Sequence, residues 1–194
     1  MTHALLIVDV QKDFCPGGSL ATQKGDEVAA GIAEMLTHPS QTEHYSAIVA
    51  TQDWHIDPAG HFSEEPDYLD SWPVHCRAET HGAEMHEALG CPAATEKIDE
   101  YFRKGHYTAA YSGFEGFAVN EDETELHPWL AQRGITHIDI VGIASDHCVF
   151  ETAKDGLNNG YAVTVLEHLC SPVNDHRAQA AFQELVSLGA TVKS

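Results

Sequence analysis

Three residues far apart in the chain could together activate a sulfur nucleophile. Cys148 lies where an apolar, β-branched run gives way to apolar residues at helical spacing, so it falls in the first turn of a predicted helix. Free backbone N–H groups and the positive end of the helix dipole favour a thiolate there and could hold a developing oxyanion. Asp9 and Lys104 each end a predicted strand. A carboxylate that accepts the thiol proton and an ammonium that holds the thiolate are the partners such a nucleophile needs.

Each of these three residues has a structural alternative. Cys148 could be a small apolar side chain packed under a strand end. Asp9 could bind backbone N–H groups, and Lys104 could be a solvated strand end. Because all three would meet at the carboxyl edge of one parallel sheet, where sites form in such folds, we favour the catalytic interpretation.

A second group of residues has the composition of a metal site. Asp53 and His55 are two apart at a strand end, so an extended chain projects both to one side. The turn Asp57–Gly60 would return His61 towards them, and His75 would arrive from the far end of the same loop. Three imidazoles and a carboxylate suit one divalent ion, zinc, manganese or iron, with water completing its shell. Chance proximity is the alternative, because the chain has 14 histidines in 194 residues.

Four aromatic residues fall in predicted loops and not on a periodic core face: Phe14, Trp72, Tyr111 and Phe114. Such residues are typical of the walls of a pocket for a small planar ligand. They could equally cap a core.

Composition narrows the class of partner. With 30 acidic against 10 basic residues, the formal charge is −20, which repels nucleic acid and anionic membranes. The five cysteines are odd in number and form no CxxC pair, so we expect reduced thiols. The apolar run Ala4–Val8 has no basic region before it and stops at Asp9, so we expect no signal peptide and a cytoplasmic location.

The elements that position these residues predict one α/β domain over residues 1–194. Ser145 or Asp146 would cap the helix that starts near Cys148. The segment from about 52 to 94 is expected to be a metal-binding, lid-like loop. Alternating strands and helices are typical of a mostly parallel, six-stranded sheet between two helical layers. Strands are expected over 4–10, 46–51, 95–104, 138–143, 161–166 and 190–193, and helices near 26–36, 128–133, 148–157 and 175–188.

The sequence resembles the nicotinamidases and pyrazinamidases of the isochorismatase-like cysteine hydrolase superfamily. The resemblance covers essentially the whole chain and is carried by IVDVQKDFCPGGSL, TQDWHIDPAGHF, SWPVHC, KGHYTAAYSGFEG and VGIASDHCVFETA. It implies the isochorismatase-like hydrolase fold and a metal-containing amidohydrolase. That enzyme would convert nicotinamide to nicotinate and ammonia through a thioester, would also act on pyrazinamide, and would serve NAD salvage.

The resemblance also implies roles for individual residues. Cys148 would be the nucleophile, Asp9 its base and Lys104 the cation that holds the thiolate, with the backbone N–H groups of Ala144 and Cys148 as the oxyanion hole. The metal ligands would be Asp53, His55, His61 and His75. The substrate would contact Phe14, Trp72, Tyr111, Ile143, Ala144 and His147.

Several alternatives remain open. The chain could hydrolyse another small carboxamide or a ureido compound, although the metal stretch counts against that. It could be an isochorismatase, although those members lack the nucleophilic cysteine. In a different class, it could be a non-catalytic, metal-binding pyridine sensor, which the intact Asp9, Lys104 and Cys148 disfavour. We expect a small-molecule substrate, no nucleic acid or membrane partner, and a monomer or small homo-oligomer.

Overall fold

A seven-stranded sheet forms the centre of the fold. The computed structural model describes residues 2–194, and its strands lie in the order β4-β3-β2-β1-β5-β6-β7. Every neighbouring pair is parallel except β3 and β4, so the expected mostly parallel sheet is confirmed, with one strand more than expected. The strands are β1 (His3–Val8), β2 (Tyr45–Asp53), β3 (Glu100–Lys104), β4 (Phe117–Ala118), β5 (His137–Ile143), β6 (Ala162–Ser171) and β7 (Thr191–Lys193).

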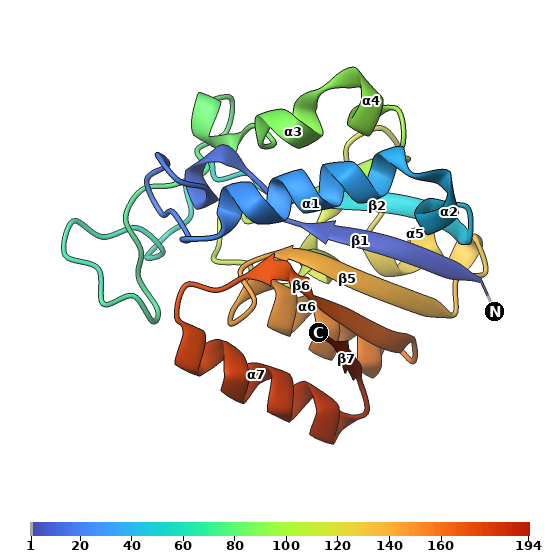
Figure 1. Cartoon of the computed structure of the whole chain (residues 1–194). Coiled ribbons are helices and arrows are strands. Elements are labelled where there is room, and N and C mark those ends of the chain that lie inside the picture. The colour runs from blue at the N-terminus through green and yellow to red at the C-terminus, as the bar shows by residue number, and fades with distance from the viewer. Residues whose placement is uncertain (1) are drawn as a thin grey trace.

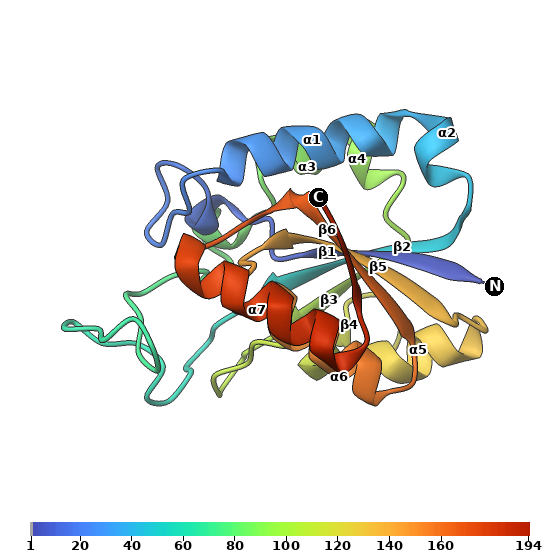
Figure 2. The same ribbon diagram turned by 60° about the horizontal axis from the view of Figure 1, so that its bottom comes forward.

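Helices cover both faces of the sheet and give three layers (Figures 1 and 2). One face carries α1 (Gly25–Thr37), α2 (Pro39–Thr42), α3 (Glu87–Gly90) and α4 (Pro92–Thr95); the other carries α5 (Leu126–Gln132), α6 (Cys148–Asn158) and α7 (Asp175–Leu188). Side chains of β1 alternate between two separate cores. Leu5 and Ile7 belong to the core on the α1 side, while Leu6 and Val8 belong to the core on the α6 side.

The part of the chain between β2 and β5 differs from expectation in two places. The strand expected over 95–104 begins only at Glu100, because α4 extends to Thr95 and turns follow it, in which the N–H groups of Lys97 and Ile98 donate to the carbonyl oxygens three residues before them. The stretch after β3, where the sequence predicts a loop around Tyr111 and Phe114, also contains β4, which pairs antiparallel with β3 through Phe102 and Ala118. The segment 52–94 also holds short elements, α3 and α4 among them.

The start of α6 also differs from expectation. Its N-cap is His147, whose side chain makes no capping hydrogen bond. Asp146 points elsewhere, since its carboxylate accepts the backbone N–H groups of Val173 at 2.8 Å and Asn174 at 3.1 Å. This carboxylate therefore ties the start of α6 to the loop before α7. Within residues 2–194 no helix is long and apolar enough to cross a membrane.

Candidate active site

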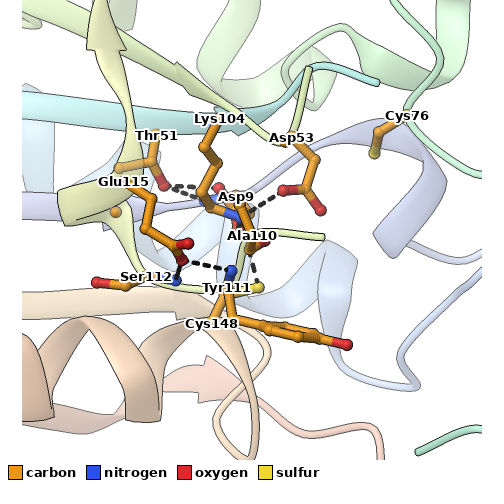
Figure 3. Close-up of polar contacts among 12 residues, drawn as sticks. Asp9, Thr51, Asp53, Cys76, Lys104, Ala110, Tyr111, Ser112, Glu115 and Cys148 are labelled. Atoms are coloured by element: carbon orange, nitrogen blue, oxygen red, sulfur yellow. Dashed lines mark hydrogen bonds and ion pairs between the residues drawn. The ribbon is translucent and has the colours of Figure 1, made fainter. Parts of the chain in front are cut away.

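The ammonium of Lys104 lies at the centre of the site, at the end of β3 (Figure 3). The side chain is fully buried and its three N–H donors have partners: Asp53 Oδ1, the carbonyl oxygen of Ala110 at 3.2 Å, and Cys148 Sγ at 3.7 Å. Nζ also lies 2.9 Å from Asp9 Oδ2. The ends of β1, β2 and β3 and the start of α6 thus deliver two carboxylates, an ammonium and a thiol to one edge of the sheet.

The Asp9 carboxylate is placed to accept a proton. Its Oδ1 accepts a 2.6 Å hydrogen bond from the hydroxyl of Thr51, whereas Oδ2 has no hydrogen-bond partner of suitable geometry within residues 2–194 and faces the Lys104 ammonium at 2.9 Å. An oxygen of Asp9, an oxygen of Asp53 and Cys148 Sγ all lie within 4.8 Å of one another. The Asp9 carboxylate is therefore a neighbour of the thiol that can take its proton.

Burial controls the protonation states of this pair. Burial raises the pKa of the Cys148 thiol well above its ordinary value, and the opposing effect of Lys104 does not cancel it. Burial likewise raises the pKa of Asp9 in spite of Lys104. The resting site consequently holds a protonated thiol, not the thiolate expected from the helix end alone. The raised pKa of Asp9 makes this carboxylate a stronger base towards that thiol.

Lys104 and Asp53 form a stable charged pair. Burial alone would lower the pKa of Lys104 and raise that of Asp53. Their mutual attraction outweighs burial in both cases, so the pKa of Lys104 rises well above its usual range and that of Asp53 falls well below. The ammonium therefore stays charged next to the thiol.

Two imidazoles turn their free nitrogens towards Asp53. His55 Nδ1 lies 2.7 Å from the carbonyl oxygen of Gly105, and His75 Nδ1 lies 2.8 Å from that of Pro73. A carbonyl oxygen only accepts, so each Nδ1 carries the hydrogen and each Nε2 keeps its lone pair. These Nε2 atoms lie 3.6 Å and 3.8 Å from Asp53 Oδ2, which is too long for hydrogen bonds.

His61 completes this group. One ring nitrogen from each of His55, His61 and His75 lies within 4.8 Å of the others. His55 Nε2 and His61 Nδ1 are buried without a hydrogen-bond partner in the part of the chain that the structure describes. Burial, with the neighbouring rings of His75 and His55, lowers the pKa of His61 to about 4, so the ring is neutral, as a metal ligand must be. Three buried imidazoles in close proximity, two of them beside the Asp53 carboxylate, fit a divalent metal ion.

A small cavity opens over the thiol. It is lined by Phe14, Leu20, Asp53, His61, Trp72, His75, Tyr111, Ala144, His147, Cys148 and Val173. The ring of Trp72 is held in place, because its Nε1 donates a 3.0 Å hydrogen bond to the hydroxyl of Tyr111 and its face meets His147 edge-on at 4.9 Å. The cavity therefore connects the sulfur with His61, His75 and a set of aromatic walls.

The backbone beside the thiol offers two free donors. The N–H groups of Ala144 and Cys148 donate to no other group within residues 2–194. The peptide between Ile143 and Ala144 is cis. Two predicted pocket residues lie elsewhere: Ile143 is fully buried in the core on the α1 side, and Phe114 packs against Tyr161 at 6.0 Å in the other core.

Several groups that contact the site residues are not predicted from the sequence. Thr51 precedes Asp53 by two residues on a strand, so strand periodicity could have found its hydroxyl. Gln11 holds the backbone of Asp53 with two 2.8 Å hydrogen bonds. The carbonyl of Ala110 carries no side-chain signal, and Leu20 is an apolar loop residue without a periodic pattern.

Comparison with known proteins gives consistent matches along the chain. The model of the isochorismatase domain matches residues 3–194. The nicotinamidase/pyrazinamidase of Mycobacterium tuberculosis is 49% identical over 183 residues, which covers 94% of each chain.

Solved structures agree with this match. The PnC1 protein of L. infantum, solved in complex with nicotinate, has a TM-score of 0.82 and 33% identity and covers 98% of this chain and 91% of its own. The pyrazinamidase of Pyrococcus horikoshii, solved in complex with zinc, has a TM-score of 0.79 and 29% identity, with 99% and 98% coverage.

Proposed function

The chain belongs to the isochorismatase domain family, and we propose that within this family it hydrolyses nicotinamide to nicotinate and ammonia, and pyrazinamide in the same way. The observation that carries the proposal is the position of Lys104, whose ammonium contacts both carboxylates and the thiol beside the cavity. The nicotinate produced is a substrate for NAD salvage.

Acylation follows from the contacts of Asp9 and Cys148. Substrate in the cavity places its carboxamide carbon over the sulfur, and Asp9 Oδ2 takes the thiol proton as the C–S bond forms. The resulting oxyanion is held by the N–H groups of Ala144 and Cys148. Lys104 stabilises the sulfur while it is negative. When the tetrahedral adduct collapses, the C–N bond breaks, Asp9 returns its proton to the nitrogen, and ammonia leaves.

Hydrolysis of the thioester uses the same residues in reverse order. A water molecule attacks the acyl carbon and gives one proton to Asp9. The C–S bond then breaks as the proton on Asp9 returns to the sulfur, and the nicotinic acid that leaves releases the second proton of the water to solvent and becomes nicotinate. Phe14 and Trp72 line the cavity around the ring in both steps and exclude further water.

Asp53, His55, His61 and His75 would hold one divalent metal ion. Such an ion would supply a Lewis-acidic centre beside the cavity. A set of three imidazoles and one carboxylate is suited to zinc, manganese or iron. The P. horikoshii relative was solved in complex with zinc. Metal analysis of the purified protein would identify the ion that the present chain binds.

The remaining features of the proposal concern the whole molecule. We place the enzyme in the cytoplasm as one domain over residues 1–194, either a monomer or a small homo-oligomer. The charge of −20 opposes any association with nucleic acid or anionic membranes.

The test is a nicotinamide reaction quenched in acid, with an ammonia assay and intact-protein and peptide mass spectrometry. A nicotinoyl adduct on the Cys148 peptide, together with ammonia, is expected for the wild-type enzyme. Cys76→Ser is the matched control, since the Cys76 thiol is also buried and influenced by Asp53, and within residues 2–194 it donates only to the carbonyl oxygen of Gly82 at 3.9 Å. An adduct on Cys76, or no ammonia from nicotinamide, would contradict the proposal.

A further inference from the structure

A second cluster of imidazoles lies at the opposite edge of the sheet from the candidate active site. His3 is the first residue of β1 and His137 the first residue of β5, and the two are register partners. Their side chains therefore leave the sheet on the same face, and their rings stack with centroids 4.4 Å apart. His44, just before β2, meets His3 edge-on at 6.1 Å. In Figure 1 these strands all begin at the end of the sheet near the N-terminus.

A carboxylate completes the cluster. Asp139 follows His137 by two residues on β5, so it faces the same way, and its Oδ1 lies 3.4 Å from His137 Nε2. The same Nε2 lies 3.0 Å from the hydroxyl of Thr164, so an ion that binds through this nitrogen would replace that hydrogen bond. Its Oδ2 accepts a 2.7 Å hydrogen bond from the hydroxyl of Tyr45, which fixes the orientation of the carboxylate. One ligand atom from each of His3, His137 and Asp139 lies within 4.8 Å of the other two. His3 Nδ1 is buried and has no hydrogen-bond partner within residues 2–194.

We propose that His3, His137 and Asp139 form a second site for a divalent transition metal ion, independent of the site around Asp53. Two imidazoles and one carboxylate are ligands for zinc, nickel or copper(II), whereas calcium and magnesium need oxygen ligands throughout. Tyr45 acts on the carboxylate as an outer partner, as in other metal sites. The orphaned nitrogen of His3 gains a partner when an ion binds.

A third group of possible metal ligands differs from the second site, because both ring nitrogens of its histidine already have partners. Cys15, Asp26 and His86 also lie within 4.8 Å of one another. His86 Nδ1, however, accepts the backbone N–H of Ala88 at 3.2 Å, so its hydrogen sits on Nε2, which faces Asp26 Oδ1 at 3.3 Å. That imidazole has no lone pair left for a metal, in contrast to His3.

An ion at the second site would join segments far apart in the chain. His3 and His137 begin neighbouring strands but are separated by more than half of the sequence. An ion that binds both only in the folded state stabilises that state by mass action. Because the site lies at the other edge of the sheet, we expect no effect on turnover.

The test measures by equilibrium dialysis how many zinc ions bind to each chain of the full-length protein. We expect two zinc ions per chain for the wild type and one for His137→Gln and for Asp139→Asn. Asp139→Asn keeps an oxygen that can accept the hydrogen bond from Tyr45, so this variant still tests the proposal if His137→Gln does not fold. His168→Gln is the control, since His168 is exposed on β6, and it should keep two. Nicotinamide turnover verifies the fold of each variant.

Three results would overturn the proposal. The first is a wild type that retains only one zinc ion. The second is two ions retained in both Asp139→Asn and His137→Gln. The third is an equal loss in His168→Gln, which would assign the second ion to surface histidines in general. A rise in melting temperature with added zinc that is larger for the wild type than for Asp139→Asn provides an independent check.

Discussion

Replacing Lys104 by methionine should both inactivate the enzyme and destabilise the fold. The ammonium is fully buried between Asp9 and Asp53, so its loss leaves two buried carboxylates without a cation. Breaking a buried ion pair by removing one partner costs about 3–5 kcal/mol. For a chain of this size that corresponds to a fall of roughly 6–20 °C in melting temperature. Methionine fills a similar volume, so packing contributes little.

The pH dependence separates this electrostatic cost from a packing defect. Lys104 is the largest of the influences that lower the pKa of Asp9 and Asp53, so we expect burial to raise the pKa of both carboxyls in the variant above their wild-type values. A carboxylate with a raised pKa contributes stability at low pH and loses it as the pH rises through that pKa. In the wild type, the lowered pKa of Asp53 acts in the opposite direction. The difference in free energy of unfolding between wild type and variant should therefore shrink from pH 7 towards pH 5.

The measurement is urea unfolding of chelator-treated protein at pH 7 and pH 5, together with nicotinamide turnover. Lys154→Met is the control, because Lys154 pairs with Glu151 at 2.9 Å with about a third of each side chain exposed, a pair worth about 0–1 kcal/mol. A Lys104→Met variant within about 1 kcal/mol of this control at pH 7, or a difference that widens at pH 5, would refute the reasoning.

Other predictions concern single groups. Cys148→Ser should lower kcat for nicotinamide by at least about 10³-fold with the fold and metal content unchanged, and a variant that keeps most of its turnover would exclude the thioester. His55→Ala should weaken zinc affinity by more than the roughly 10–100-fold seen when a ligand merely loses its outer partner; wild-type metal content would show that His55 is no ligand. Burial raises the pKa of Cys170 from 9.0 to about 12, so it contributes stability that is lost as the pH rises above 9. In Cys170→Ser the fall in free energy of unfolding between pH 9 and 10.5 should be shallower by about 1.4 kcal/mol per pH unit, and an unchanged slope would contradict the assignment.

The sequence predicts most of the central sheet because its strands are apolar on both faces. β1, β2 and β5 each stand out as short β-branched runs, and their order with α1 predicts a parallel sheet. β4 escapes prediction because two residues in an aromatic, glycine-containing stretch give no periodic pattern. The start of β3 is predicted too early because the first turn after Pro92 is helical for only four residues.

Most of the candidate site can be predicted from one rule, that the carboxyl ends of parallel strands meet at the same edge of a sheet. This rule alone predicts the proximity of four residues: Asp9, Asp53, Lys104 and Cys148. The protonation state of the thiol could not be predicted in that way. The helix end favours a thiolate, but burial of Cys148 raises its pKa, and burial depends on the whole fold. The carbonyl of Ala110 escapes prediction for a related reason, since a backbone acceptor has no signature in the sequence.

The two outer strands of the sheet, β4 and β7, are too short to promote aggregation by strand pairing. β4 has two residues and β7 has three, so each edge exposes very few unpaired backbone groups to another chain. Lys193 adds a charge at the β7 edge. A sheet that ends in such short strands is a poor template for pairing with a second copy. Any oligomer of this protein is therefore expected to associate through side chains of its helices and loops, with the sheet remaining closed to extension.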